Sequence, residues 1–308
     1  ISADSHIVEP PDMYTSRFQP KLRNQAPHME RRKTPAGREY DAWMLNGQQV
    51  GTLGAVMQAG QRFEDPSQID FLGVWEDVRK GAYDPYSMLR ENEEDGIWGS
   101  VRQPSQGLFW DRGPDTALLN EICRVYNDWI AAFCSHDPKR LKGIAMINVD
   151  DIDAAVRELE RARRIGLAGA MITVAPPAWG SYRLPAYDRL WAAAQDLAMP
   201  LSLHVGTDRA DPRMGDAAFK LNVKDVPPSR FVNQDYQVRI SLSEMIYSGV
   251  FERFPKLRIG AIEHELSWIP VFLQRLDYNY TDRPPRGPEW RRFDDPNVLP
   301  SDFFRRNV

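Results

Sequence analysis

The sequence lacks a long apolar run and an excess of basic charge, and we expect no signal for export. No run reaches the roughly 20 apolar residues of a membrane span, and no basic segment followed by an apolar one begins the chain. A formal net charge of -4 provides no basic field to attract nucleic acid or anionic lipid. We therefore expect no nucleic-acid partner and no membrane partner.

Cysteine is also scarce, because it occurs only at Cys123 and Cys134. Both lie in one expected helix over residues 115–136, where the helical rise separates them by roughly 16 Å. A disulfide needs Cα atoms about 4.4 to 6.8 Å apart. Two free thiols are expected, which fits a cytoplasmic location.

The chain has 308 residues, of which 42% are hydrophobic and 11% aromatic. This composition is typical of a globular protein with a large core. The length suits one (β/α)₈ barrel with an insertion. We expect a single domain over residues 1–308.

Short apolar runs alternate with longer amphipathic segments, which is typical of βα units and a parallel sheet. Six strands are expected, at residues 1–6, 96–101, 141–149, 167–174, 200–205 and 257–263. No Gly-x-Gly-x-x-Gly loop follows the first of them, so an open dinucleotide-binding sheet loses support. The fold class predicted is α/β, as a (β/α)₈ TIM barrel.

Two segments interrupt the barrel pattern. Residues 13–82 are rich in charge, Pro, Gly and Gln without a long periodic segment, so we interpret them as an insertion that forms a lid over the first strand. Residues 301–308 resemble a helix that turns into a strand and stops. The carboxyl-terminal end of the barrel is therefore expected to be incomplete in this sequence.

Only five histidines occur, and three of them stand at expected strand ends. Asp4 and His6 alternate on the first strand and so point to the same side. His204 ends the fifth strand, and Glu263 and His264 end the sixth. Since the active site of such a barrel lies at the carboxyl ends of its strands, these residues predict a shared metal site.

For several other residues a purely structural role is an alternative to a functional one. His28 in the insertion and His136 near a helix end are expected to be non-catalytic. Arg102, just past the second strand, is expected to bind a substrate carboxylate or to form a surface ion pair. The tryptophans near the insertion and second strand are expected in the core or lining a substrate pocket; they are Trp43, Trp75, Trp98 and Trp110.

Longer strings resemble a known family. Ala-Asp-Ser-His-Ile-Val-Glu-Pro-Pro-Asp-Met at residues 3–13, Met-Ile-Tyr-Ser-Gly-Val-Phe-Glu-Arg-Phe-Pro-Lys-Leu at 245–257, and Trp-Ile-Pro at 268–270 with Arg-Leu-Asp at 275–277 carry the likeness. They are similar to the amidohydrolase-related family that includes aminocarboxymuconate-semialdehyde decarboxylase. The resemblance covers nearly the whole chain except the insertion.

The resemblance implies a barrel, a divalent metal, and hydrolysis or non-oxidative decarboxylation. Its first-strand ligands fall on Asp4 and His6, its fifth-strand ligand on His204 and its catalytic histidine on His264. Its last ligand, an aspartate commonly within Gly-Ser-Asp-Tyr-Pro, has no counterpart here. Trp268 is a further expected substrate contact.

We expect a metal-dependent hydrolase or decarboxylase of a small carboxylic acid, with zinc or manganese as cofactor. In it, Glu263 and His264 are the expected catalytic residues. One carboxylate with two histidines also suits non-haem iron, so an iron oxygenase of natural-product metabolism is the alternative. Its second iron would add Glu9, Glu263 and His264 as ligands.

A barrel that binds a small molecule without turning it over is a second alternative. The missing aspartate is its main support. In each case the expected partner is a small molecule, and a homodimer is left open.

Overall fold

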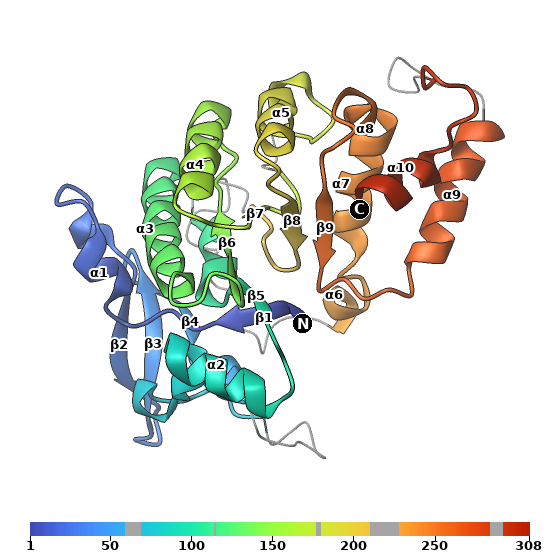
Figure 1. Cartoon of the computed structure of the whole chain (residues 1–308). Coiled ribbons are helices and arrows are strands. Elements are labelled where there is room, and N and C mark those ends of the chain that lie inside the picture. The colour runs from blue at the N-terminus through green and yellow to red at the C-terminus, as the bar shows by residue number, and fades with distance from the viewer. Residues whose placement is uncertain (59–68, 114, 177–179, 210–227, 284–291) are drawn as a thin grey trace. The chain divides into compact units, whose positions relative to one another are not determined.

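The computed structural model describes residues 1–58, 69–113, 115–176, 180–209, 228–283 and 292–308 (Figure 1). The chain divides into two compact units. Among the described residues, unit 1 comprises residues 1–144 and unit 2 comprises those from 145 onward. Each unit combines parallel strands with helices, as expected of an α/β fold.

All six expected strands are present and parallel. Unit 1 pairs β1 (Ser2–Ile7) with β5 (Ser100–Pro104), and β5 with β6 (Leu141–Met146). Unit 2 pairs β7 (Gly169–Ile172) with β8 (Leu201–His204), and β8 with β9 (Ile259–Ile262). Within each unit the strand order follows the chain, as β1-β5-β6 in unit 1 and β7-β8-β9 in unit 2 (Figure 1). Closure into an eight-stranded barrel stays a prediction.

Helices separate the strands, and local capping explains where several of them begin. The side chains of Asp84, Asp115 and Asp151 each accept a backbone N–H three residues later, which satisfies a donor that a helix start leaves without a partner. The helices are α1 (Met13–Arg17), α2 (Pro85–Glu94), α3 (Thr116–Cys134), α4 (Ile152–Arg164), α5 (Asp188–Asp196), α6 (Pro228–Val232), α7 (Tyr236–Tyr247), α8 (Val250–Arg253), α9 (Ile269–Thr281) and α10 (Pro300–Asn307).

The insertion has more order than its composition indicates. It contains α1 and an antiparallel sheet of β2 (His28–Lys33), β3 (Glu39–Leu45) and β4 (Gln48–Thr52) (Figure 1). The pair Asn46 and Gly47 joins β3 to β4 with φ angles of 51° and 74°. An Asn-Gly pair favours this left-handed turn, so the hairpin had a signal in the sequence. The lid role of residues 13–82 stays a prediction.

Aromatic side chains attach the insertion sheet to the rest of unit 1. Trp43 of β3 and Trp110 are both buried and meet edge to face, with ring centroids 6.0 Å apart. Tyr14 of α1 packs against both rings and accepts a hydrogen bond from Trp110 Nε1 at 2.8 Å. Core packing is thus confirmed for Trp43 and Trp110, whereas Trp98 is 60% exposed.

The second expected strand has the wrong bounds. The strand expected at residues 96–101 is β5, at Ser100–Pro104. Gly96, with φ of 69°, follows the end of α2, and a short loop precedes the first strand residue. Arg102 therefore lies inside the strand and not beyond it.

The expected strand at the end of the chain is also wrong, because α10 occupies Pro300–Asn307. The Asp302 carboxylate accepts the Leu299 N–H at 2.9 Å and so caps the first turn of this helix. At its other end, Asn307 is buried and its side-chain amide donates to the carbonyl oxygens of Pro255 and Leu257.

The expectation about the cysteines is confirmed. Cys123 and Cys134 are buried free thiols. Among the described residues, none of the helices has the length and apolar character needed to cross a membrane.

Candidate metal centre

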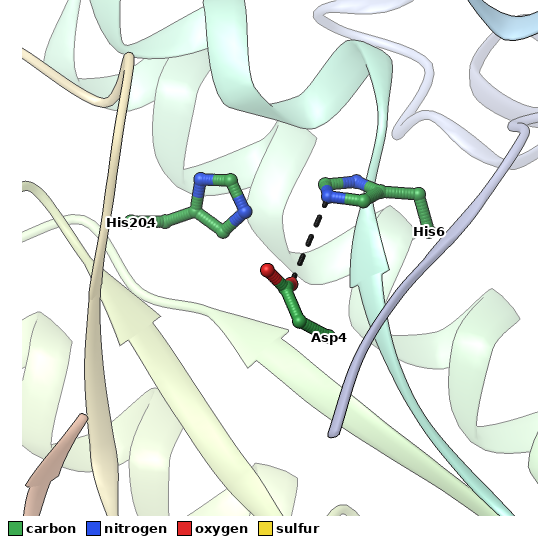
Figure 2. A group of neighbouring side chains, drawn as sticks. All are labelled: Asp4, His6 and His204. Atoms are coloured by element: carbon green, nitrogen blue, oxygen red, sulfur yellow. Dashed lines mark ion pairs between the residues drawn. The ribbon is translucent and has the colours of Figure 1, made fainter. Parts of the chain in front are cut away.

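His6 and Asp4 project from β1. The Nδ1 atom of His6 lies 2.8 Å from the carbonyl oxygen of Pro104 on β5. Because a carbonyl oxygen only accepts, the neutral imidazole carries its hydrogen on Nδ1 and keeps the Nε2 lone pair for a metal ion. Figure 2 shows Nε2 facing the carboxylate of Asp4, at 3.9 Å from Oδ1. Both side chains are about one-third exposed, at 29% and 32%.

His204 ends β8 and is fully buried. Its Nδ1 atom lies 2.8 Å from the carbonyl oxygen of Val205, so this imidazole too carries its hydrogen on Nδ1. Its Nε2 atom lies 3.7 Å from Oε2 of Glu263. The Thr207 hydroxyl donates to the His204 carbonyl oxygen at 2.7 Å and accepts the Val174 N–H at 2.9 Å, which fixes the turn after the strand.

Glu263 and His264 follow β9 in a strained segment. Glu263 and Glu265 have φ angles of 62° and 60°, a left-handed conformation that costs a non-glycine residue about 1 kcal/mol or more. The Glu263 side chain is 53% exposed. Such strain recurs at functional sites, and here it brackets one of the expected catalytic residues.

The His264 imidazole is buried between two backbone carbonyl groups. Its Nδ1 lies 3.1 Å from the Gln234 oxygen and its Nε2 lies 3.2 Å from the Leu203 oxygen. Burial lowers the pKa of His264 below its usual value, while the two carbonyl contacts act in the opposite direction. Both nitrogens therefore face backbone oxygens, and a catalytic role for His264 stays a prediction.

Glu9, an expected ligand of a second iron, is fully buried. Its Oε2 accepts the N–H of Gln106 at 3.0 Å and its Oε1 accepts the N–H of Gly107 at 2.9 Å. Burial raises the pKa of Glu9, and these two hydrogen bonds lower it by less. Each carboxylate oxygen thus already has a backbone partner.

The expected substrate contacts are both largely buried. Arg102, only 6% exposed, donates to the carbonyl oxygen of His6 at 3.2 Å and to Oδ1 of Asn92 at 3.2 Å, and burial lowers its pKa to about 10. The alternative of a surface ion pair is therefore wrong for Arg102. Trp268 donates to the Glu265 carbonyl oxygen at 3.0 Å and packs on Phe272.

Asp4, His6 and His204 are a candidate set of metal ligands, since each offers one atom of the kind that binds divalent ions. Figure 2 draws all three. Two imidazoles with hydrogen on Nδ1 and one carboxylate suit zinc or manganese. Carbonyl partners on the remote nitrogen are also usual for metal-binding histidines. The donor chemistry therefore fits a divalent metal ion.

A buried ion pair in the loops after β6 and β8 was not predicted from the sequence. Arg209 contacts Asp150 with two parallel bonds, Nε to Oδ1 at 3.0 Å and Nη2 to Oδ2 at 2.7 Å. Their side chains are 1% and 3% exposed. Both residues follow strand ends, as the expected ligands do, and that position was the signal for finding them.

Unit 2 also contains a cavity of about 860 Å³ between α7 and α9. Tyr236, Ile240 and Glu244 line it on α7, and Phe272 and Leu276 line it on α9. None of the expected ligands or substrate contacts is among its lining residues. The case for the metal centre consequently depends on ligand chemistry and not on this cavity.

Comparison with known proteins identifies the relatives of this chain. Residues 74–293 match the amidohydrolase family. Gamma-resorcylate decarboxylase of Rhodococcus jostii is 31% identical over 194 residues, which is 59% of this chain and 57% of that protein. 2-Amino-3-carboxymuconate-6-semialdehyde decarboxylase of Dictyostelium discoideum is 22% identical over 216 residues, which is 68% of this chain and 55% of that protein.

Solved structures show the same fold. An amidohydrolase from Mycobacterium avium subsp. paratuberculosis aligns with a TM-score of 0.73 at 18% identity, over 100% of this chain and 81% of that one. A dihydroxybenzoic acid decarboxylase from Polaromonas, solved with manganese and the inhibitor 2-nitroresorcinol, aligns with a TM-score of 0.58 at 22% identity. That alignment covers 76% of this chain and 69% of the other.

The chain spans somewhat more than half the length of the curated relatives that it matches, at 57% and 55%. The expected resemblance to the decarboxylase branch of the amidohydrolases is confirmed.

Proposed function

The chain belongs to the amidohydrolase family, and from this we propose that it is a metal-dependent enzyme that removes carbon dioxide from an aromatic carboxylic acid without oxidation. The relatives support decarboxylation over hydrolysis, since gamma-resorcylate decarboxylase and the aminocarboxymuconate-semialdehyde enzyme both bear that name. The solved relative with 2-nitroresorcinol supports a hydroxylated benzoic acid as the substrate class.

The main support for the proposal is that both histidines carry their ring hydrogen on Nδ1. Both His6 and His204 have Nδ1 beside a backbone carbonyl oxygen, which leaves Nε2 as the ligand atom. We propose that these atoms and the Asp4 carboxylate hold one divalent ion. Manganese is favoured because a solved relative binds it, and zinc is the alternative. The bound ion would stabilise negative charge on the substrate oxygens.

The chain's own residues would manage the proton. Loss of carbon dioxide leaves a carbanion on the ring, and a proton must be delivered to that carbon. We propose His264 as the group that carries this proton, with the partly exposed Glu263 as the second candidate. For that role, the His264 imidazole has to exchange its contact with the Leu203 or the Gln234 carbonyl oxygen for one with the substrate.

Arg102 and Trp268 are the proposed substrate contacts. The Nε atom of Arg102 is buried without a hydrogen-bond partner among the described residues. Buried donors in proteins nearly always have an acceptor, and a substrate carboxylate could accept a hydrogen bond from this one. Trp268 offers an indole face to an aromatic ring.

The geometry disfavours the iron oxygenase with two metal ions. Of its second set of ligands, Glu9 already accepts two backbone N–H groups and His264 lies between two carbonyl oxygens. Recruiting both to a metal would break one carbonyl contact of His264 and at least one N–H contact of Glu9. A single-metal enzyme leaves both hydrogen bonds of Glu9 in place.

An activity assay tests this proposal. The metal-free protein would be reconstituted with Mn²⁺ or Zn²⁺ and given hydroxybenzoic acids, including 2,6-dihydroxybenzoic acid, while carbon dioxide release and oxygen uptake are measured together. The expected result is metal-dependent release of carbon dioxide without oxygen uptake. Oxygen uptake would establish the oxygenase instead, and binding without turnover would establish a binding protein.

Two histidine variants localise the metal. We expect His204→Ala to abolish metal loading and turnover. His136→Ala, which changes an exposed histidine just past α3, is the matched control and should keep both. Retained metal content in His204→Ala would refute the ligand assignment.

A further inference from the structure

Glu9 and His6 hold the same short segment of unit 1. His6 donates from Nδ1 to the carbonyl oxygen of Pro104 at 2.8 Å. Glu9, three residues after His6, accepts the N–H groups of Gln106 and Gly107 at 3.0 and 2.9 Å. The end of β5 and the residues that follow it are therefore fastened to the residues around His6 at three points.

The carboxylate is suited to this task in a way that an amide is not. The two oxygens of Glu9 each accept one N–H from consecutive residues, so both must be acceptors. A glutamine of the same shape has one oxygen and one NH₂ group, and its NH₂ group would face a second donor. Since Glu9 is fully buried, water cannot replace the lost contact.

The backbone of His6 is held from a second direction. Arg102 of β5 donates from Nη1 to the His6 carbonyl oxygen at 3.2 Å and from Nη2 to Asn92. The position of the His6 main chain is thus fixed through Arg102, while the acceptor of its ring is fixed through Glu9. These contacts restrict the orientation of the His6 imidazole ring.

We propose that Glu9 is a positioning residue for the metal ligand His6. By holding Gln106 and Gly107, it keeps the Pro104 carbonyl oxygen against Nδ1 of His6 and so keeps the Nε2 lone pair available for the metal ion. This inference rests on the proposed function, because it takes His6 as a ligand. It also gives Glu9 a role other than that of a ligand to a second metal.

Glu121 provides a matched control within the same unit. It is 5% exposed and accepts the backbone N–H of Gln19 at 2.8 Å, again through a carboxylate. Its other contacts include the side chains of Gln19 and Arg124. None of these residues contacts His6 or Pro104 through a hydrogen bond described above. Glu121→Gln therefore removes a buried carboxylate without touching the acceptor of His6.

The test measures Mn²⁺ binding to wild type, Glu9→Gln and Glu121→Gln by the electron paramagnetic resonance signal of free Mn²⁺. We expect one ion per chain in all three. The Kd of Glu9→Gln should rise about 10- to 100-fold, as is typical when the partner of a metal-binding histidine is lost. The Kd of Glu121→Gln should stay within about twofold of wild type, even where its unfolding midpoint falls as much as that of Glu9→Gln.

A second readout needs no metal. The ¹⁵N chemical shifts of the His6 ring, assigned with a His6→Gln variant, report which nitrogen carries hydrogen. Wild type should show hydrogen on Nδ1, and Glu9→Gln should show a mixture of the two tautomers. If Glu9→Gln does not fold, Glu9→Asp replaces it, since the shorter carboxylate keeps the charge but reaches only one of the two amides.

The outcomes separate this inference from the proposed function. A wild type that binds no Mn²⁺ would defeat the metal proposal, while the tautomer measurement would still judge the role of Glu9. An unchanged tautomer, or equal loss of affinity in Glu9→Gln and Glu121→Gln, would overturn the positioning role. A fall from two ions to one in Glu9→Gln would overturn it too, because Glu9 would then be a ligand.

Discussion

The Nδ1 atom of His204 lies 2.8 Å from the carbonyl oxygen of Val205, the residue that follows it. A histidine at the last position of β8 is thus oriented by its own turn. His6 reaches the same protonation pattern through a different strand, by its contact with Pro104. In both imidazoles Nδ1 donates to a backbone carbonyl oxygen, and this shared arrangement is the strongest structural support for the proposed metal ion.

Thr207 should stabilise the turn that carries His204. Its buried hydroxyl donates to the His204 carbonyl oxygen and accepts the Val174 N–H. Thr207→Val keeps the shape but removes both hydrogen bonds of the hydroxyl, so we expect a loss of about 1 to 3 kcal/mol in the free energy of unfolding. Urea denaturation measures it. Thr281→Val, at an exposed threonine, should change that free energy by about 0.5 kcal/mol at most.

The ion pair of Arg209 and Asp150 should be costly to break from one side. Arg209→Met removes both bonds that Arg209 makes to the buried Asp150 carboxylate, and we expect a destabilisation of about 3 to 5 kcal/mol in chemical denaturation. Arg90→Met is the control, because Arg90 and Glu94 are both about two-thirds exposed. That variant should change stability by about 1 kcal/mol or less; equal losses in the two variants would contradict the account.

His264 should make the stability of the metal-free protein depend on pH. Its pKa in the folded state is lowered, chiefly by burial. Between that pKa and the usual value of about 6.5, the unfolded chain binds more protons than the folded one. The free energy of unfolding therefore rises with pH through this window. As pH falls below about 6.5, protonation of His264 in the unfolded chain lowers that free energy step by step.

A His264→Gln variant tests this contribution. Unfolding free energies measured between about pH 5 and about pH 7.5 should rise less steeply with pH than in wild type. A slope that stays unchanged in His264→Gln would show that His264 does not carry this pH dependence.

The sequence predicted the strands, and the positions of the candidate ligands on them, best where a local pattern was sufficient. His204 stands at the end of a short apolar strand, and an aspartate cap marks where each of α2, α3 and α4 begins. Asp4 and His6 lie on one side of β1 because side chains alternate along a strand. These features depend on a few neighbouring residues.

Features that depend on residues far apart in the chain could not be predicted from local sequence patterns. The hydrogen bond from His6 to Pro104 joins residues 98 positions apart, and that from Glu9 to Gln106 joins residues 97 apart. Glu9 therefore looked like a metal ligand by residue type, although its oxygens face backbone amides. Likewise, the left-handed conformation of Glu263 has no glycine or asparagine to signal it.

The central claim is that Asp4, His6 and His204 bind one divalent metal ion. The most direct test is anomalous X-ray diffraction from crystals of the protein grown with Mn²⁺. The account predicts one manganese peak per chain, with Nε2 of His6, Nε2 of His204 and an Asp4 carboxylate oxygen each about 2.0 to 2.3 Å away. A manganese ion bound elsewhere, or bound through Nδ1 of either histidine, would contradict it.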